Sequence, residues 1–325
     1  MYDLQSGVRH EEFPKAGRLP PSWLLIFCRA RDVCPGAGYE TREGVLLLTV
    51  TTLASGSSGN AALVSCGRTH ILLDAGISAR RITTALKALG VPPQELSAIV
   101  ITHEHHDHVS GLGVLCKQIP AAVAASPATC RYLADKLPQL QGRLRGQEPG
   151  TGVQMGEIWV ESFATPHDAA GSVGYSFSAE GRRLVLCTDL GYVTPEVKRA
   201  AEGCDLLICE TNHDEDWVRT GPYPYYLKQR VLGDRGHLSN EAGAELAALA
   251  VESGARTVIL AHLSSENNTP AHARAAVCRR LSAMGCDPER DICLAVAPRK
   301  ETGPVYRLEE DGAAVAFALR GAALC

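Results

Sequence analysis

The sequence has 325 residues, of which 45% are hydrophobic, so it can bury a large core as one large domain or as two smaller ones. This composition excludes a disordered chain, and the formal net charge of −4 excludes a general electrostatic attraction to nucleic acid, so any such binding needs a local basic patch. The twelve cysteines include no C-x-x-C pair, which favours buried, reduced thiols and a cytoplasmic location over a disulfide framework.

The first 44 residues mix Pro, Gly, Arg and acidic residues without a sustained period, which predicts a poorly ordered extension over 1–44. The apolar run at 23–28 is too short to span a membrane and lacks the flanks of an export signal. Because the first strand-like run begins near Val45, we expect the natural translation start close to that residue and a single folded domain over 45–325.

Three β-rich runs, separated by glycine-containing turns, predict a meander of strands. These runs are 46–53, 60–65 and 69–73. The loop between the first two consists of small residues whose backbone can approach a ligand closely, so Ser57, Ser58 and Asn60 are candidate substrate-binding residues. A flexible turn is the alternative. A helix at 78–89 follows, with serine at its start and glycine at its end.

An apolar run at 98–101 predicts a buried strand that ends in four ligand-type side chains. These are His103, His105, Asp107 and His108. Both imidazoles of His103 and His105 can face one side of an extended segment, whereas Asp107 and His108 begin a helix and face another. One segment can therefore serve two metal ions. Imidazole and carboxylate suit Zn²⁺, Mn²⁺ or Fe, and an incidental histidine-rich loop is the alternative.

The pattern His-x-His-x-Asp-His at 103–108, placed after an apolar strand, resembles the signature of the metallo-β-lactamase-fold hydrolases. The resemblance implies an α/β (α+β) protein built as an αββα four-layer sandwich, with the hydrolase domain over 45–325. Alternating strands and helices after the signature agree with such layers. We expect a helix at 109–119 with Val114, Leu115 and Ile119 facing inward, a strand at 122–125 and a helix at 127–137.

Further ligand-type side chains follow predicted strands at 157–164, 182–187 and 257–261: they are His167, Asp189 and His262. The resemblance assigns one divalent cation to His103, His105 and His167 and a second to Asp107, His108 and His262. Asp189 would bridge them, because a carboxylate has two oxygens. Phosphodiester and thioester hydrolases of this fold have Asp at this position, whereas the best-known β-lactamases have Cys; Cys187 is two residues away and is expected in the core.

A succession of polar loops later in the chain resembles the WalJ/YycJ (VicX) group of bacterial metallohydrolases. The matching segments are 55–60, 210–214, 223–230, 236–240 and 261–268. The likeness spans about residue 46 to the C-terminus and implies a metal-dependent nuclease, with DNA favoured over RNA and exonuclease digestion from the 5′ end. A small-molecule (cyclic) phosphodiesterase and a thioester hydrolase remain alternatives, because the ligand set is common to all of them. A metal-binding regulatory protein without turnover is a third.

Asp107 and His237 are the expected catalytic residues. His237 lies just before a predicted helix at 239–253, a favourable position for a phosphate. By resemblance to tRNA 3′-end-processing relatives it would bind the phosphate or protonate the leaving oxygen, unless it is a surface residue near a helix cap. Ser239 and Asn240 are further candidates for substrate binding.

Two acidic residues at strand ends, Asp74 and Glu210, are expected to orient metal-bound histidines. For Asp74, an ordinary turn aspartate is the alternative. Lys228 and Arg230 lie on or near a predicted helix that also carries Tyr223, Tyr225 and Tyr226. A basic and aromatic surface there fits a nucleic-acid strand, although a solvated helix face explains it at least as well. We expect no membrane association. Protein partners and self-association are left open by the sequence.

Overall fold

A computed structural model describes residues 46–318. The expectations for residues 1–44 therefore lie outside the described residues. Nine cysteines fall within 46–318 and all of them are free. Among the helices of this part of the chain, none is both long enough and apolar enough to cross a membrane.

Two mixed sheets form the centre of the described part. In residues 46–318 the first sheet has eight strands, in the order β15 (Ala314–Phe317), β14 (Val305–Leu308), β1 (Thr49–Ala54), β2 (Ala61–Cys66), β3 (Thr69–Leu73), β4 (Ala98–Val100), β5 (Ala122–Ala125) and β6 (Leu144–Gly146). The second sheet of the same region has seven, in the order β13 (Cys293–Val296), β12 (Thr257–Ala261), β11 (Leu206–Glu210), β10 (Arg182–Cys187), β9 (Val173–Ala179), β8 (Ile158–Ala164) and β7 (Gly152–Met155).

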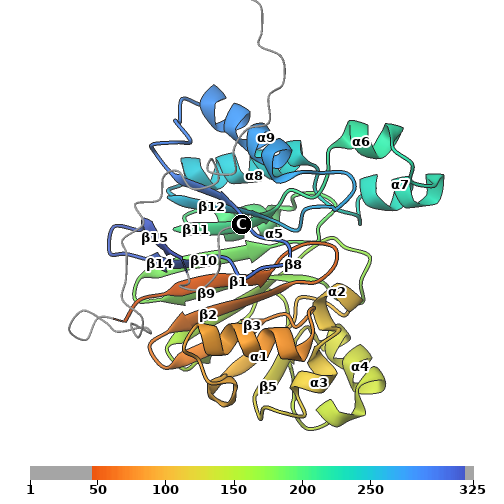
Figure 1. Cartoon of the computed structure of the whole chain (residues 1–325), viewed down its shortest axis with the longest axis vertical. Coiled ribbons are helices and arrows are strands. Elements are labelled where there is room, and N and C mark those ends of the chain that lie inside the picture. Colours follow the sequence, from red (N-terminus) through yellow and green to blue (C-terminus); the bar gives the residue numbers. More distant parts are fainter. Residues whose placement is uncertain (1–45, 319–325) are drawn as a thin grey trace, which may run out of the picture. The chain divides into compact units, whose positions relative to one another are not determined.

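Helices cover the outer faces of both sheets (Figure 1). Those on the first sheet are α1 (Ala79–Ala88), α3 (Leu112–Leu115) and α4 (Pro127–Lys136), and those on the second are α5 (Pro195–Ala201), α8 (Asn240–Glu252) and α9 (Pro270–Ala283). Two further helices, α6 (Glu215–Thr220) and α7 (Tyr225–Leu232), lie side by side (Figure 1). Short 3₁₀ turns occupy Pro93–Glu95 and Pro138–Leu140.

Most of these helices begin at a side-chain cap that accepts a hydrogen bond from the backbone N–H three residues on, as sequence spacing predicts. The capping residues are Ser78, Ser126, Thr194, Asp214, Ser239 and Thr269.

Alternating side chains along the strands divide the interior into three apolar layers. On β3, Ile71 and Leu73 pack between the sheets, whereas Leu72 packs toward the helices of the first sheet. On β11, Ile208 packs between the sheets and Leu207 packs toward α5, α8 and α9. The expected αββα four-layer sandwich is confirmed.

The prediction of a single helix at 109–119 is wrong. The chain forms α2 (His106–Val109) and α3 instead, because the N–H of Gly111 donates to the carbonyl of Ala75 (2.8 Å) and a Cβ at Gly111 would lie 2.0 Å from Ile77 O. This interruption changes the phase of the second helix. Val114, expected to face inward, is therefore 53% exposed, while Leu115 and Ile119 are buried as expected.

Candidate metal centre

The candidate centre lies where the carboxyl ends of several strands meet. β3 and β4 run parallel in the first sheet, and β10, β11 and β12 run parallel in the second, so the residues that follow them reach common edges. Three of these residues adopt the left-handed conformation within two residues of the end of their strands: Asp74 (φ 59°), Asp189 (φ 61°) and His262 (φ 55°). Such backbone costs about 1–3 kcal/mol per residue and tends to gather at functional sites.

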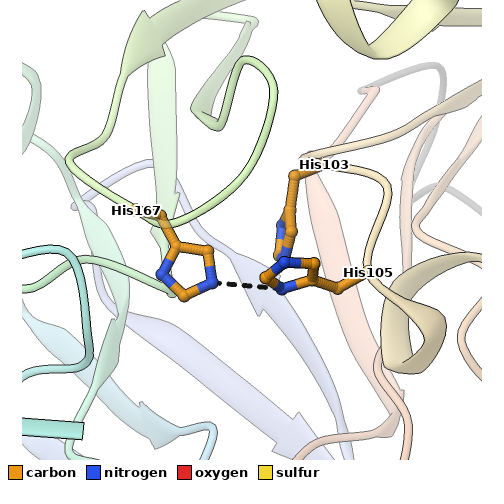
Figure 2. Close-up of side chains that lie close together, drawn as sticks. All are labelled: His103, His105 and His167. Carbon is orange, nitrogen blue, oxygen red and sulfur yellow. Dashed lines mark hydrogen bonds between the residues drawn. The ribbon is translucent and has the colours of Figure 1, made fainter. Parts of the chain in front are cut away.

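Three imidazoles converge in the first cluster, formed by His103, His105 and His167 (Figure 2). The Nδ1 atom of His105 lies 3.3 Å from Nε2 of His167, and the ring of His103 is 4.5 Å from that of His105 between centroids. His103 and His167 are buried, and His105 is partly open to solvent. The ligand atoms of all three lie within 4.8 Å of one another.

A second cluster joins Asp107, His108 and His262, which come from α2 and from the end of β12. Asp107 Oδ2 lies 3.4 Å from His262 Nε2 and 3.5 Å from His108 Nε2. Both histidines are fully buried, whereas the Asp107 side chain is 24% exposed. Asp107 is therefore the member of this cluster that faces solvent.

The carboxylate of Asp189 lies between the two clusters. Its Oδ2 is 3.3 Å from His108 Nε2, and its Oδ1 is 3.8 Å from His167 Nε2. Because Asp189 is buried, its two oxygens face protein groups on either side and not bulk water.

Hydrogen-bond acceptors on the outer side of the histidines determine which ring nitrogen is available to bind a metal. Asp74 Oδ2 lies 2.8 Å from His108 Nδ1, the carbonyl of Gly236 lies 3.0 Å from His167 Nδ1, and Glu210 Oε1 lies 2.8 Å from His262 Nδ1. Since these oxygens accept a hydrogen bond, the proton belongs on Nδ1 and the lone pair of Nε2 faces the centre.

Two atoms of the centre indicate that these residues fit a metal. His103 Nε2 and Asp189 Oδ2 are buried and have no hydrogen-bond partner among the described residues. A buried polar atom without a partner costs free energy, and a cation would satisfy both atoms at once. Imidazole and carboxylate in one cluster form a donor set suited to divalent transition metals.

The carboxylates give the centre a strongly negative character. Burial acts to lower the pKa of His262, but Asp189, Asp107 and Glu210 raise that pKa to about 10. Burial also acts to raise the pKa of Asp189, but the imidazoles of His262 and His108 hold it well below its usual range. The carboxylates therefore stay ionised and stabilise positive charge at the centre.

Glu210 connects the centre to His237. Its Oε1 lies 2.8 Å from Nδ1 of both His237 and His262, and its Oε2 accepts hydrogen bonds from the N–H groups of Leu190 and Leu238. Glu210 is fully buried, and His237 is 20% exposed. The same carboxylate thus orients one histidine inside the centre and one at its rim.

The predicted substrate-binding residues occupy different environments. Ser57 and Ser58 are exposed in the loop between β1 and β2, whereas Asn60 is buried and its side-chain amide lies 3.1 Å from His108 Nε2. Asn240 is fully buried and exchanges amide hydrogen bonds with Asn268, so it is not accessible to a ligand in this structure.

Ser239 and Lys228 have local partners. The Ser239 hydroxyl caps α8 by accepting from the N–H of Ala242, and Lys228 Nζ donates to the carbonyl of Arg219 at 2.7 Å. These contacts place both side chains in structural roles, and their contribution to substrate binding stays a prediction.

Two residues at the centre were not singled out from the sequence. Asp168 Oδ1 lies 3.4 Å from His167 Nε2 and 3.7 Å from His105 Nε2, and its position next to His167 was a usable signal. The Thr102 hydroxyl lies within 3.1 Å of Asp74, His103 and His108. No sequence feature marks it apart from its place before the histidine motif.

The residues of both clusters fall within one family match. The model of the β-lactamase superfamily domain matches residues 69–263, well over half of the chain. The chain therefore belongs to the metallo-β-lactamase superfamily, as its fold and its paired ligand clusters indicate.

Within this superfamily, the chain is related to two bacterial exodeoxyribonucleases. It is 38% identical to exodeoxyribonuclease WalJ of Streptococcus pneumoniae (serotype 2, strain D39) over 221 residues, which cover 66% of this chain and 81% of WalJ. It is 36% identical to exodeoxyribonuclease YycJ of Bacillus anthracis over 241 residues, which cover 73% of this chain and 90% of YycJ. The resemblance to the WalJ/YycJ group is confirmed.

A solved structure supports the fold independently. The metallo-β-lactamase-fold protein YhfI of Bacillus subtilis superposes with a TM-score of 0.63 at 17% identity, over 80% of this chain and 99% of YhfI. At this identity the likeness concerns the fold alone.

Proposed function

We propose that this protein is a DNA exonuclease that acts from the 5′ end and uses two divalent cations to hydrolyse phosphodiester bonds. The observation that carries the proposal is the position of Asp189 between two clusters of ligand-type side chains, with His237 at the rim. The names of the WalJ and YycJ relatives support DNA as the substrate. The preference for DNA over RNA and a cytoplasmic location stay predictions.

In this proposal, His103, His105 and His167 hold one cation, Asp107, His108 and His262 hold the other, and Asp189 is shared. Zn²⁺ and Mn²⁺ suit this donor set, with Fe as a third candidate. Bound there, the cations would activate water as a nucleophile and offset the charge of the phosphodiester.

The protein's own side chains supply proton transfer and orientation. Because the Nδ1 proton of His237 is directed to Glu210, its Nε2 remains available to bind a phosphate oxygen or to protonate the leaving oxygen. Asp107, the solvent-facing carboxylate of the second cluster, is placed to accept a hydrogen bond from the attacking water and to orient it. Glu210 and Asp74 keep the histidines oriented.

The proposal is tested with Mn²⁺-loaded protein on a 5′-phosphorylated DNA duplex and on bis(p-nitrophenyl) phosphate. We expect mononucleotide release from the duplex and its loss in the Asp107→Ala His108→Ala variant, by a factor on the order of 10² or more. His106→Ala is the matched control, because His106 lies in the same segment but is exposed and belongs to neither cluster.

Each other outcome points to a different enzyme. Cleavage of the small diester with intact DNA would identify a small-molecule phosphodiesterase, and no cleavage of either would point to thioester hydrolysis. Digestion that requires a free 3′ end would contradict the proposed polarity.

The Glu210→Gln variant is expected to lose about 10- to 100-fold in metal affinity or hydrolysis rate. Glu210 accepts hydrogen bonds from four donors, and an amide NH₂ would face some of them with a donor of its own. Metal content and the rate on bis(p-nitrophenyl) phosphate measure the loss. Glu252→Gln, at an exposed position on α8, is the control. If the Glu210→Gln protein has the same metal content and the same rate as this control, Glu210 does not position the histidines.

A further inference from the structure

Four cationic side chains gather beside the candidate centre. Arg80 and Arg81 lie on the first turn of α1, and Arg299 and Lys300 lie in the loop between β13 and β14. We call these four residues the basic surface. Arg80, Arg81 and Lys300 are exposed, and none of the four forms an ion pair within residues 46–318.

The arginines of helices α5, α6, α7 and α9 differ, because most of them are neutralised by carboxylates. The pairs are Arg199 with Glu196, Arg219 with Glu215, Arg230 with Asp168, Arg274 with Glu289 and Arg280 with Glu245. Residues 75–94, in contrast, contain Arg80, Arg81 and Lys87 and no carboxylate. In a chain of net charge −4, this region can supply the local positive potential that nucleic acid requires.

Direct contacts hold the two halves of the basic surface together. Arg81 Nη2 donates to the carbonyl of Lys300 at 2.8 Å, which joins α1 to the β13–β14 loop. Arg299 Nη2 donates to the carbonyl of Ser264 at 2.7 Å, two residues beyond His262. Its stem lies over Gly56, where an added Cβ would be 3.1 Å from Arg299 Cγ.

The loop at 55–60 connects the basic surface to the centre. At one end, the N–H of Ser55 donates to the carbonyl of Pro298 (3.1 Å), and the Ser55 hydroxyl accepts from the N–H of His262 (2.9 Å). At the other end, the N–H of Asn60 donates to the carbonyl of Asp107 at 2.8 Å. The basic surface is therefore one short loop away from the second cluster, to which Asp107 and His262 belong.

A hollow adds polar groups on the same side. It has a volume of about 450 Å³ and is lined by Ser78, Arg80, Thr83, Ser110 and Gln118 among others. Hydroxyl and amide groups thus lie next to a guanidinium without a carboxylate partner, a combination that suits phosphate oxygens.

Helix α7, for which the sequence leaves a nucleic-acid surface and an ordinary solvated face equally open, carries fewer unpaired cations than the basic surface. Lys228 donates to a backbone carbonyl, as Arg81 does, but the other cation of α7 is paired: Arg230 Nε lies 2.6 Å from Asp168 Oδ2. Tyr225 and Tyr226 are exposed and can still stack on bases, but the charge of Arg230 is neutralised by its ion pair with Asp168.

We propose that the basic surface binds the phosphate backbone of the DNA next to the phosphate that enters the metal centre. This inference rests on the proposed function and identifies where its substrate is held. The exposed guanidinium and ammonium groups neutralise backbone phosphates without reading sequence, as an exonuclease requires.

The test compares the metal-loaded wild type with the variant Arg80→Ala Arg81→Ala Lys300→Ala. The readout is the Kd of a fluorescent, 5′-phosphorylated phosphorothioate duplex, measured over a series of salt concentrations. We expect the Kd at about 0.1 M salt to rise roughly tenfold or more, and the slope of log K against log salt to become shallower by about 2 to 3, since each lost phosphate contact removes about 0.9. Arg299 is left intact because its guanidinium holds the backbone at Ser264, two residues from His262, whereas Arg81 holds only the backbone of the exposed Lys300.

Arg68→Ala is the matched control. Arg68 is exposed and has no ion pair among the described residues, but it lies in the turn between β2 and β3, at the far ends of the strands that lead to Asn60 and Asp74. Its Kd and salt slope should equal those of the wild type. The single variant Arg80→Glu should also raise the Kd. Because Arg80 is at an exposed helix position, this variant tests the basic surface even if the triple variant does not fold.

The outcomes separate the two proposals. Suppose that the wild type binds and digests DNA, but the triple variant and Arg80→Glu have the same Kd and salt slope as Arg68→Ala. The proposed role of the basic surface is then wrong, and the proposed function stands. If the wild type hydrolyses bis(p-nitrophenyl) phosphate but neither binds nor digests DNA, both the proposed function and the proposed role of the basic surface are wrong.

Discussion

The Asp189→Asn variant will lose metal and at least about 10²-fold in phosphodiester hydrolysis. Asp189 is buried, and its oxygens lie 3.3 Å from His108 Nε2 and 3.8 Å from His167 Nε2, one from each cluster. An amide of the same shape removes the negative charge and one of the two acceptor oxygens. Neither cation would then keep its shared ligand.

Metal content per chain, measured by mass spectrometry of the purified protein, reports this loss independently of activity. The rate on bis(p-nitrophenyl) phosphate reports it a second time. Asp135→Asn is the control, because Asp135 is exposed on α4 and contributes to neither cluster. An Asp189→Asn protein with the metal content and the rate of the wild type would contradict the proposed bridging role of Asp189.

Replacing Gly76 by alanine will lower the free energy of unfolding by more than about 3 kcal/mol, at or beyond the upper end of overpacking costs. A Cβ at Gly76 would lie 1.6 Å from the carbonyl oxygen of Asp107 and 2.7 Å from the N atom of Asn60. These are backbone atoms, so no side-chain rotation relieves the clash. The segment that carries Asp107 and His108 must move, and metal affinity should fall with stability.

Denaturant unfolding of the metal-free and metal-loaded proteins measures both effects. Gly146→Ala is the matched control, because Gly146 also avoids positive φ and its added Cβ would lie at an ordinary 3.5 Å from Pro127. Equal stability of the Gly76→Ala and Gly146→Ala proteins would show that the Asp107 loop can shift freely.

Much of the fold could be predicted because its signals are local. Apolar runs such as 98–101 and 257–261 correspond to β4 and β12, and the serine caps at Ser78 and Ser239 mark the starts of α1 and α8. Strand β9 also carries a readable alternation of Val173, Tyr175 and Phe177, although no strand was predicted there. The error at 109–119 has another origin, since backbone contacts from residues 75–77, distant in sequence, interrupt that helix.

The ligand-type side chains of the metal centre could be identified from the sequence, because the type of each side chain and its place after a strand are local properties. Other contacts of the site became visible only in the folded chain. The tertiary structure brought Asp168 to the first cluster, placed Asn240 in a closed amide pair with Asn268, and joined Arg81 to Lys300, 219 residues away. Such contacts depend on how sheets and loops pack across the whole chain, and a local pattern carries no information about them.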